Sequence, residues 1–216
     1  LSWLWIFVLL AVVVMVIYPS VVLLLNSFQE SGRLSLGNYA TILSRADTWV
    51  VLKNTLYVSI LGTLFGSIVG IALAWLVART DLPWKGFFAS ALIVPYLIPP
   101  FIGAIAWLYL LGPVGYLNKL YMGLSGASDP LWSIYGSTGV ILVMTLYGFP
   151  LPYMVNVGPF RRMNAALEQA AMISGASPWR TMRDITLPLM LPSITSSTLL
   201  LFTSLMANFG IPAVIG

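Results

Sequence analysis

The chain has 216 residues, of which 59% are hydrophobic and only 7% are charged, and its mean hydropathy is +0.95. A typical soluble domain has about 25% charged residues, so this composition excludes an ordinary water-soluble protein. Cysteine and histidine are both absent, which removes disulfides, thiol nucleophiles, the usual zinc sites and a histidine base. We therefore expect no catalytic residue, no metal site, no cofactor bound by this chain and no enzymatic activity of its own.

The charged residues leave five windows without any formal charge, namely 1–29, 54–78, 86–118, 130–160 and 185–216. Each window exceeds the about 20 residues that an α-helix needs to cross a bilayer. The runs are apolar throughout instead of alternating, which argues against a β-barrel. The sequence predicts an all-α fold, a polytopic bundle of membrane helices in a single domain over residues 1–216. We place the spans near 3–25, 55–78, 87–111, 134–156 and 193–213.

Four loops connect these spans. The loops 79–85 and 157–192 lie on the same side, because two spans separate them, and they hold six of the ten basic residues. The positive-inside rule places them in the cytoplasm. Membrane topology thereby explains the net charge of +4, so we expect membrane lipid as a partner and no nucleic acid.

Prolines interrupt three of the spans, at Pro95, Pro99, Pro100, Pro150, Pro152 and Pro212. Each proline removes a backbone donor and kinks its helix. Two interpretations stay open: ordinary packing kinks, or breaks that line a path through the membrane.

The loop 157–192 contains the signals for two short helices. Asn164 is a suitable N-cap for a helix of about ten residues, and Gly175 can take the left-handed conformation that ends it. Ser177 and Pro178 then begin a second helix, and Pro188 and Pro192 mark its junction with the fifth span. Such a compact pair of helices suits insertion into a groove of another subunit.

The same loop resembles a known signature. At their spacing, the residues that match are Gln169, Ala170, Ala171, Gly175, Ile185, Leu187 and Pro188. This pattern is similar to the cytoplasmic signature of binding-protein-dependent ABC importer permeases, written EAA, then G, then IxLP. The resemblance implies the transmembrane domain of a type I ABC importer in the bacterial inner membrane. It also implies a coupling loop that docks on a cytosolic ATP-binding subunit, where ATP is bound and hydrolysed.

The resemblance implies two further partners. One is a second permease half, fused or separate, and the other is a periplasmic or lipid-anchored solute-binding protein. Residues 54–56, 78–83 and 209–213 look like the ferric-iron branch, which is close to the polyamine and aminoethylphosphonate branches. The solute is therefore expected to be ferric iron, with polyamine or phosphonate as alternatives. The chain is similar to the first half of such permeases without its final span, and we expect it to be trimmed at both ends.

One position departs from the signature. The leading glutamate is Gln169 here, and Glu168 stands one residue earlier in the coupling loop. Because a helix turns about 100° per residue, Glu168 points away from the family's direction. A salt bridge that the family forms at the leading position is therefore not carried over to this sequence, and we expect docking to depend on shape more than on charge. A surface helix that merely ends at a glycine is the alternative interpretation.

Candidate residues for the solute path lie in the fourth and fifth spans, at Tyr147, Thr203, Ser204 and Asn208. The alternative function is a secondary transporter or channel driven by an ion gradient. Such proteins keep ionisable residues inside the membrane, which the five charge-free windows argue against. An intramembrane enzyme would have only serine and threonine to use, such as those at 195–198, and helix packing explains these more simply.

Overall fold

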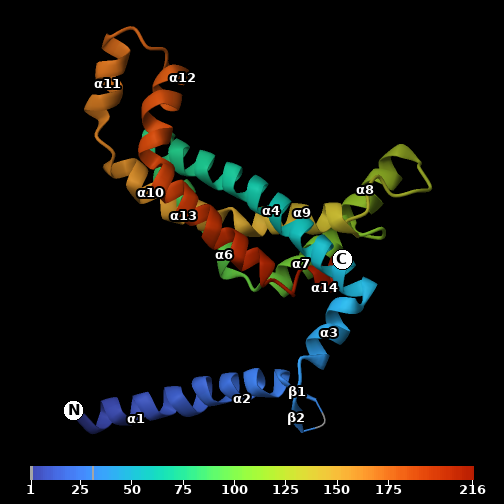
Figure 1. Cartoon of the computed structure of the whole chain (residues 1–216). Helices are drawn as coiled ribbons and strands as arrows, with labels where there is room; N and C mark the ends of the chain where they lie inside the picture. The colour runs from blue at the N-terminus through green and yellow to red at the C-terminus, as the bar shows by residue number, and fades with distance from the viewer. Residues whose placement is uncertain (1, 31) are drawn as a thin grey trace. The chain divides into compact units, whose positions relative to one another are not determined.

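The computed structural model describes residues 2–30 and 32–216, and helices dominate it (Figure 1). The all-α fold class is confirmed. In the described part of the chain, five helices are long and apolar enough to cross a membrane: Trp3–Ser27, Ala46–Arg79, Pro100–Ser125, Ser137–Arg162 and Pro178–Met206. The chain forms two compact units, residues 1–53 and 54–216, and the single domain stays a prediction.

The first unit contains one long apolar helix and a small hairpin. The helix consists of α1 (Ser2–Val12), a π-helical segment η1 (Val13–Ile17) and α2 (Tyr18–Ser27). Strands β1 (Gln29–Glu30) and β2 (Arg33–Leu34) pair antiparallel and precede α3 (Gly37–Ser44). A hydrogen bond of 2.7 Å between the hydroxyls of Ser27 and Tyr39 ties α2 to α3.

The second unit begins within α4 (Ala46–Arg79) and carries the remaining helices. In chain order these are α5 (Lys85–Ala91), α6 (Val94–Leu97), α7 (Pro100–Leu111), α8 (Tyr116–Ser125), α9 (Ser137–Gly148), α10 (Pro150–Arg162), α11 (Ala165–Ile173), α12 (Pro178–Thr181), η2 (Met182–Thr186), α13 (Leu187–Met206) and α14 (Pro212–Ile215).

Glycines on α4 allow the neighbouring helices to approach closely. A Cβ on Gly70 would lie 2.3 Å from the carbonyl oxygen of Phe149, and one on Gly66 would lie 3.0 Å from Leu201 Cδ2. Small residues at helical spacing are a common way to pack helices in membranes, where the hydrophobic effect contributes little to helix association. Helix α4 is thereby held against the α9–α10 junction and against α13.

A buried amide joins α10 to α13, which run side by side (Figure 1). Asn156 is fully buried, and its Nδ2 donates hydrogen bonds of 2.8 Å to the Pro152 carbonyl and to Ser197 Oγ. Apolar residues pack around this contact in two clusters, one including Val143, Met144 and Leu201, the other including Tyr153 and Phe160.

Prolines break the third span more than the others. The region predicted as a span at 87–111 consists of α5, α6 and α7, and Ile98 and Pro99 are extended between the last two. By contrast, Phe149 before Pro150 keeps helical angles, so α9 and α10 follow each other directly. The last long helix ends at Met206, short of the predicted 213.

The helix that starts at Pro178 differs from the prediction, because it does not end at Pro188 but continues to Met206. The π-helical turn η2 lies just before this proline, and the Leu187 N–H bonds to the Met182 carbonyl, five residues back. Such a widened turn accommodates a residue that offers no donor and would otherwise clash with the preceding turn. Segment η1 precedes Pro19 in the same way, with the Tyr18 N–H bonded to the Val13 carbonyl.

Candidate functional site

Helix α11 begins and ends where the sequence predicts. Asn164 Oδ1 accepts a hydrogen bond of 3.0 Å from the Ala166 N–H. At the other end Gly175 has φ +87°, the Ala176 N–H bonds to the Ala171 carbonyl, and the Gly175 N–H bonds to the Met172 carbonyl, both at 3.0 Å. This pair of bonds is a Schellman motif, which uses a left-handed residue and is most easily made by glycine.

A second cap starts the next helix after a short turn. Ser177 Oγ accepts a hydrogen bond of 3.3 Å from the Arg180 N–H, and Pro178 occupies the first turn. Helices α11 and α12 stand side by side at one end of the second unit (Figure 1). Four large apolar side chains are exposed here, Leu167, Met172, Ile173 and Trp179, and the last two are the most exposed, at 87% and 68%. Exposed apolar groups of this size indicate a contact surface.

The signature residues divide between two places. Ala171, Gly175 and Ile185 line a cleft of about 320 Å³ between α11 and the start of the long helix, together with Ser174, Ala176, Arg180, Thr181 and Asp184. Gln169, Ala170, Leu187 and Pro188 are exposed and lie outside this cleft. The pattern thus brings three of its members together around one hollow.

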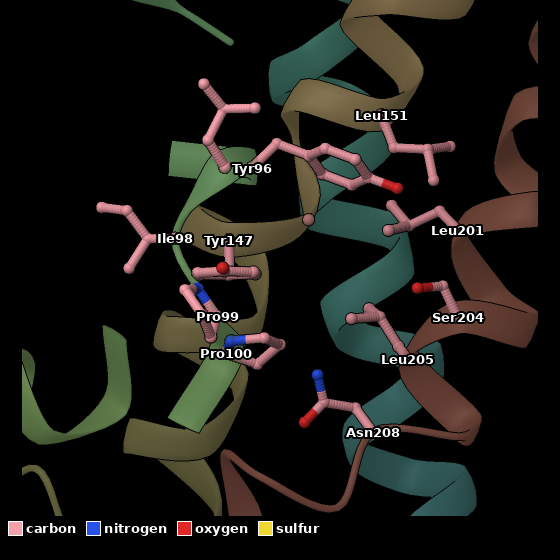
Figure 2. Close-up of a pocket in the computed structure, with 12 residues that line it drawn as sticks. Tyr96, Ile98, Pro99, Pro100, Tyr147, Leu151, Leu201, Ser204, Leu205 and Asn208 are labelled. Carbon is pink, nitrogen blue, oxygen red and sulfur yellow. The ribbon is translucent and has the colours of Figure 1, made fainter. Parts of the chain in front are cut away.

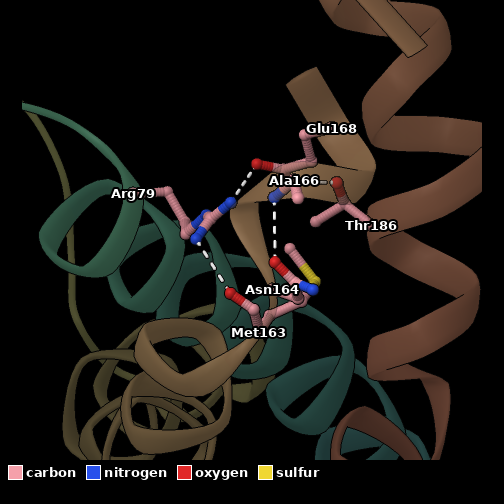
Figure 3. Close-up of polar contacts among 6 residues, drawn as sticks. All are labelled: Arg79, Met163, Asn164, Ala166, Glu168 and Thr186. Atoms are coloured by element: carbon pink, nitrogen blue, oxygen red, sulfur yellow. Dashed lines mark hydrogen bonds and ion pairs between the residues drawn. The ribbon is translucent and has the colours of Figure 1, made fainter. Parts of the chain in front are cut away.

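Glu168 forms an ion pair that was not predicted from the sequence. Its Oε2 pairs with an Nη of Arg79, at the end of α4, and its Oε1 accepts a hydrogen bond of 2.6 Å from Thr186 Oγ1 (Figure 3). The side chains of Arg79 and Glu168 are only 13% and 18% exposed. Neighbouring residues on a helix point about 100° apart. Glu168 is therefore directed inward while Gln169 is exposed.

Arg79 also holds the chain at the entry to α11. Its second Nη donates a hydrogen bond of 3.3 Å to the Met163 carbonyl, directly before the Asn164 cap (Figure 3). Sequence reasoning missed this role. The only sign of this role in the local sequence is that Arg79 is a basic residue in the last turn of a long apolar helix. A favourable interaction with the helix dipole is enough to explain a basic residue there.

A second candidate site is a cavity of about 350 Å³ beside the broken third span (Figure 2). It brings together three of the four predicted path residues, Tyr147, Ser204 and Asn208. Thr203 does not line it; its hydroxyl donates to the Leu200 carbonyl at 3.0 Å. Thr203 and Ser204 are adjacent on the helix and face about 100° apart, and of the two only Ser204 is turned to the cavity.

Two features of the lining were not predicted. Tyr96 and the extended backbone at Ile98 and Pro99 complete the cavity. In this span the prolines therefore break the helix where it lines a cavity, which is the second of the two interpretations. The twelve lining residues described are all uncharged.

Tyr147 lies between two hollows. A Cβ on Gly103 would come within 3.1 Å of the Tyr147 ring, so the glycine makes room for it. The Tyr147 hydroxyl has no hydrogen-bond partner among the described residues. A second cavity, of about 420 Å³ and lined mainly by apolar residues of α6, α7 and α9, also has Tyr147 in its wall. The ring is therefore a partition between a partly polar and an apolar space.

The described residues include no group of three His, Cys, Asp or Glu that could hold a metal ion. The absence of a cofactor on this chain stays a prediction.

Residues 62–216 match the family of binding-protein-dependent transport system inner membrane components. This chain belongs to that family. The resemblance seen in the loop signature is thereby confirmed, and the chain is a multi-pass protein of the inner membrane. The ion-gradient-driven alternative is not favoured.

Several relatives of this binding-protein-dependent family are similar to the chain. The molybdenum transport system permease protein ModB of Escherichia coli (strain K12) is 34% identical over 169 residues, which are 75% of this chain and 69% of ModB. The ferric transport system permease protein FbpB of Actinobacillus pleuropneumoniae is 25% identical over 213 residues, 97% of this chain and 30% of FbpB. The chain spans about a third of the length of the ferric transport relatives that it matches.

Solved structures share the fold. The chain superimposes with a TM-score of 0.73 and 21% identity on a chain of a bacterial ABC transporter involved in the import of the acidic polysaccharide alginate, covering 99% of this chain and 81% of that one. The likeness shows that the helices are arranged as in an ABC importer permease.

Proposed function

We propose that this chain is a transmembrane permease subunit of an ATP-binding-cassette importer, and that the cavity beside Tyr147 forms part of its solute path. The observation that carries the proposal is the attachment of α11 to two transmembrane helices through Glu168. The helix at Pro178–Met206 starts next to α11 and supplies Ser204 to the cavity. Its 29 residues span about 43 Å at 1.5 Å per residue, so it joins the two sites as one rigid element.

The surface around α11 and α12 is the proposed dock for the cytosolic ATP-binding subunit. Its exposed Ile173 and Trp179 can anchor in a groove of a partner, and the cleft at Ala171 and Gly175 can receive a side chain from it. ATP would be bound and hydrolysed in that partner, and the permease would respond by moving α11 together with α4 and α13.

The uncharged lining of the cavity fits a path that passes the solute without holding it tightly. Selection would then rest with a periplasmic or lipid-anchored solute-binding protein, and a second permease half, fused or separate, would close the path. Ferric iron stays the first proposal for the solute, supported by the likeness to FbpB, with polyamine or phosphonate as alternatives. The likeness to ModB keeps an oxyanion among the solutes to test.

A pair of leucine substitutions tests the docking surface. Ala171→Leu adds bulk in the cleft, and Ala165→Leu adds the same bulk at an exposed position about 120° around the same helix. Overpacking costs about 1 to 3 kcal/mol, which corresponds to a roughly fivefold to over hundredfold loss of affinity for the ATPase. The measurement is copurification with the ATP-binding subunit and solute-stimulated ATP hydrolysis in proteoliposomes. Normal coupling in Ala171→Leu would contradict the assignment, and Ala165→Leu should stay within about twofold of the wild type.

A further inference from the structure

Helix α8 lies at the end of the second unit opposite α11 (Figure 1). It begins after a short turn that follows the last residue of α7. The Leu111 carbonyl at the end of α7 accepts a hydrogen bond of 3.3 Å from the Ile134 N–H, just before α9 starts. Two transmembrane helices therefore end at the same level, and α8 projects from that level, where lipid headgroups are expected.

The one amide side chain of α8 faces inward. Asn118 is only 3% exposed, and its Nδ2 donates hydrogen bonds of 2.8 Å to the Gly112 carbonyl and 2.7 Å to the Trp132 carbonyl. These two carbonyls belong to the turn that enters α8 and to the segment that returns from it. The side chain thus fixes the helix on both sides, and it leaves the opposite face of α8 outward.

That outward face is apolar. Leu117, Leu120 and Leu124 are 47%, 59% and 81% exposed, and their spacing of three and four residues places them on one side of the helix. A helix in water normally turns such a stripe inward and its polar residues outward. In α8 the stripe is exposed instead, while the amide of Asn118 is buried, which suits a surrounding that is itself apolar on the side of the stripe.

We propose that α8 is an interfacial helix, lying in the headgroup region of the leaflet opposite the docking loop, with its leucine stripe against the acyl chains. Lipid is the occupant because α8 lies where two membrane-crossing segments end and because the last turn of α7, which precedes it, also exposes apolar side chains, with Tyr109 65% and Leu110 38% exposed. Lys119 is exposed about 100° around the helix from Leu120 and is the only cation of the helix. A lysine at this depth can extend its ammonium to the lipid phosphates.

The absence of cysteine from the chain makes spin labelling a direct test. Single cysteines replace Leu120 or Leu124 and receive a nitroxide, in the assembled transporter reconstituted in phosphatidylcholine and phosphatidylglycerol vesicles. Collisions are measured with oxygen, which partitions into lipid, and with a water-soluble nickel chelate. Phe101→Cys on α7, where Phe101 is 52% exposed, is the lipid reference, and Ser128→Cys, exposed in the loop after α8, is the water reference.

We expect both α8 positions to resemble the Phe101 reference in oxygen collisions and to show chelate collisions at least about fivefold below the Ser128 reference. Chelate access equal to that of Ser128 would place the stripe in water and overturn the proposal. Low collision with both reagents would show that a protein surface, such as a receptor or the second permease half, covers α8, and would also overturn it. Neither outcome depends on which solute is transported.

Discussion

Glu168 forms an ion pair with Arg79, although the two residues lie 89 positions apart in the chain. The other carboxylate oxygen accepts the hydrogen bond from Thr186. One side chain at the start of α11 is therefore bound both to the end of α4 and to the π-helical turn before α13. The docking helix cannot move without moving these two transmembrane helices or breaking this contact.

The first prediction concerns this ion pair. Glu168→Gln leaves the mostly buried guanidinium of Arg79 without a carboxylate partner. Arg79→Gln leaves the mostly buried carboxylate of Glu168 without a cation. Hydrogen bonds to charged groups contribute about 1.5 to 3 kcal/mol, so each variant should lower the unfolding free energy by about that amount. The double variant should lose less than the sum, with a coupling of about 0.5 to 3 kcal/mol. A double-mutant cycle on unfolding in mixed micelles measures it.

An exposed ion pair in the same region is the control. Arg180 and Asp184 are 74% and 53% exposed, with 3.5 Å between their nearest nitrogen and oxygen. Surface pairs at this spacing contribute about 0.3 to 0.5 kcal/mol, so Asp184→Asn should have a small effect. If Glu168→Gln proves equally mild, the carboxylate does not fasten α11.

The second prediction compares two glycines that end helices. Gly175 after α11 and Gly126 after α8 have φ +87° and φ +70°, and a Cβ on either would meet no atom within 4 Å. Valine at either site therefore meets the same backbone penalty, about 1 to 2 kcal/mol. We expect Gly175→Val to reach the membrane but to lose binding to the ATPase more than tenfold, because the Schellman turn shapes the docking cleft. Gly126→Val should bind within about twofold of the wild type.

The readout is copurification from mild detergent, followed by solute-stimulated ATP turnover. Unchanged turnover in Gly175→Val would remove the docking role from this turn. Equal losses in both variants would point to general misfolding.

The third prediction tests the close packing of α4. Gly70→Ala would place a methyl group 2.3 Å from the Phe149 carbonyl oxygen, and backbone cannot give way as a side chain can. Gly86→Ala adds the same methyl in open space. We expect the first to lower the unfolding free energy by about 1 to 3 kcal/mol or more and the second to be nearly neutral or stabilising. Thermal unfolding in detergent compares them; a neutral Gly70→Ala would mean that the helices are further apart.

Local signals in the sequence were sufficient for some of these features. The charge-free windows indicate helices that cross the membrane, and Asn164 and Gly175 mark the ends of α11, because caps depend on neighbouring residues only. The partnership of Arg79 with Glu168 could not be predicted, since it depends on how distant helices pack. The continuity of the helix through Pro188 was missed because a π-helical turn can absorb a proline.

The fourth prediction concerns topology. Ser177 and Ser128 are exposed in loops at opposite ends of the second unit, and the basic residues place the loop of Ser177 in the cytoplasm. A cysteine at Ser128 should react with an impermeant maleimide in intact cells, whereas one at Ser177 should react only after permeabilisation. Labelling of the Ser177 variant in intact cells would invert the proposed orientation.

The last prediction uses two neighbours on α13 to test the solute path. Ser204 lines the cavity beside Tyr147, whereas Thr203 faces elsewhere and binds the carbonyl of its own helix. In this cysteine-free chain, Ser204→Cys and Thr203→Cys place the same thiol about 100° apart around the helix axis. A methanethiosulfonate reagent that adds a positive charge should inhibit solute uptake by Ser204→Cys more than tenfold, because burying a charge in an uncharged cavity is costly. Uptake by Thr203→Cys should change less than about twofold. The rate of modification at Ser204 should also fall when transport substrate and ATP are both present, since an occupied path excludes the reagent. Rapid modification of Ser204→Cys without any loss of uptake would show that the cavity lies off the path.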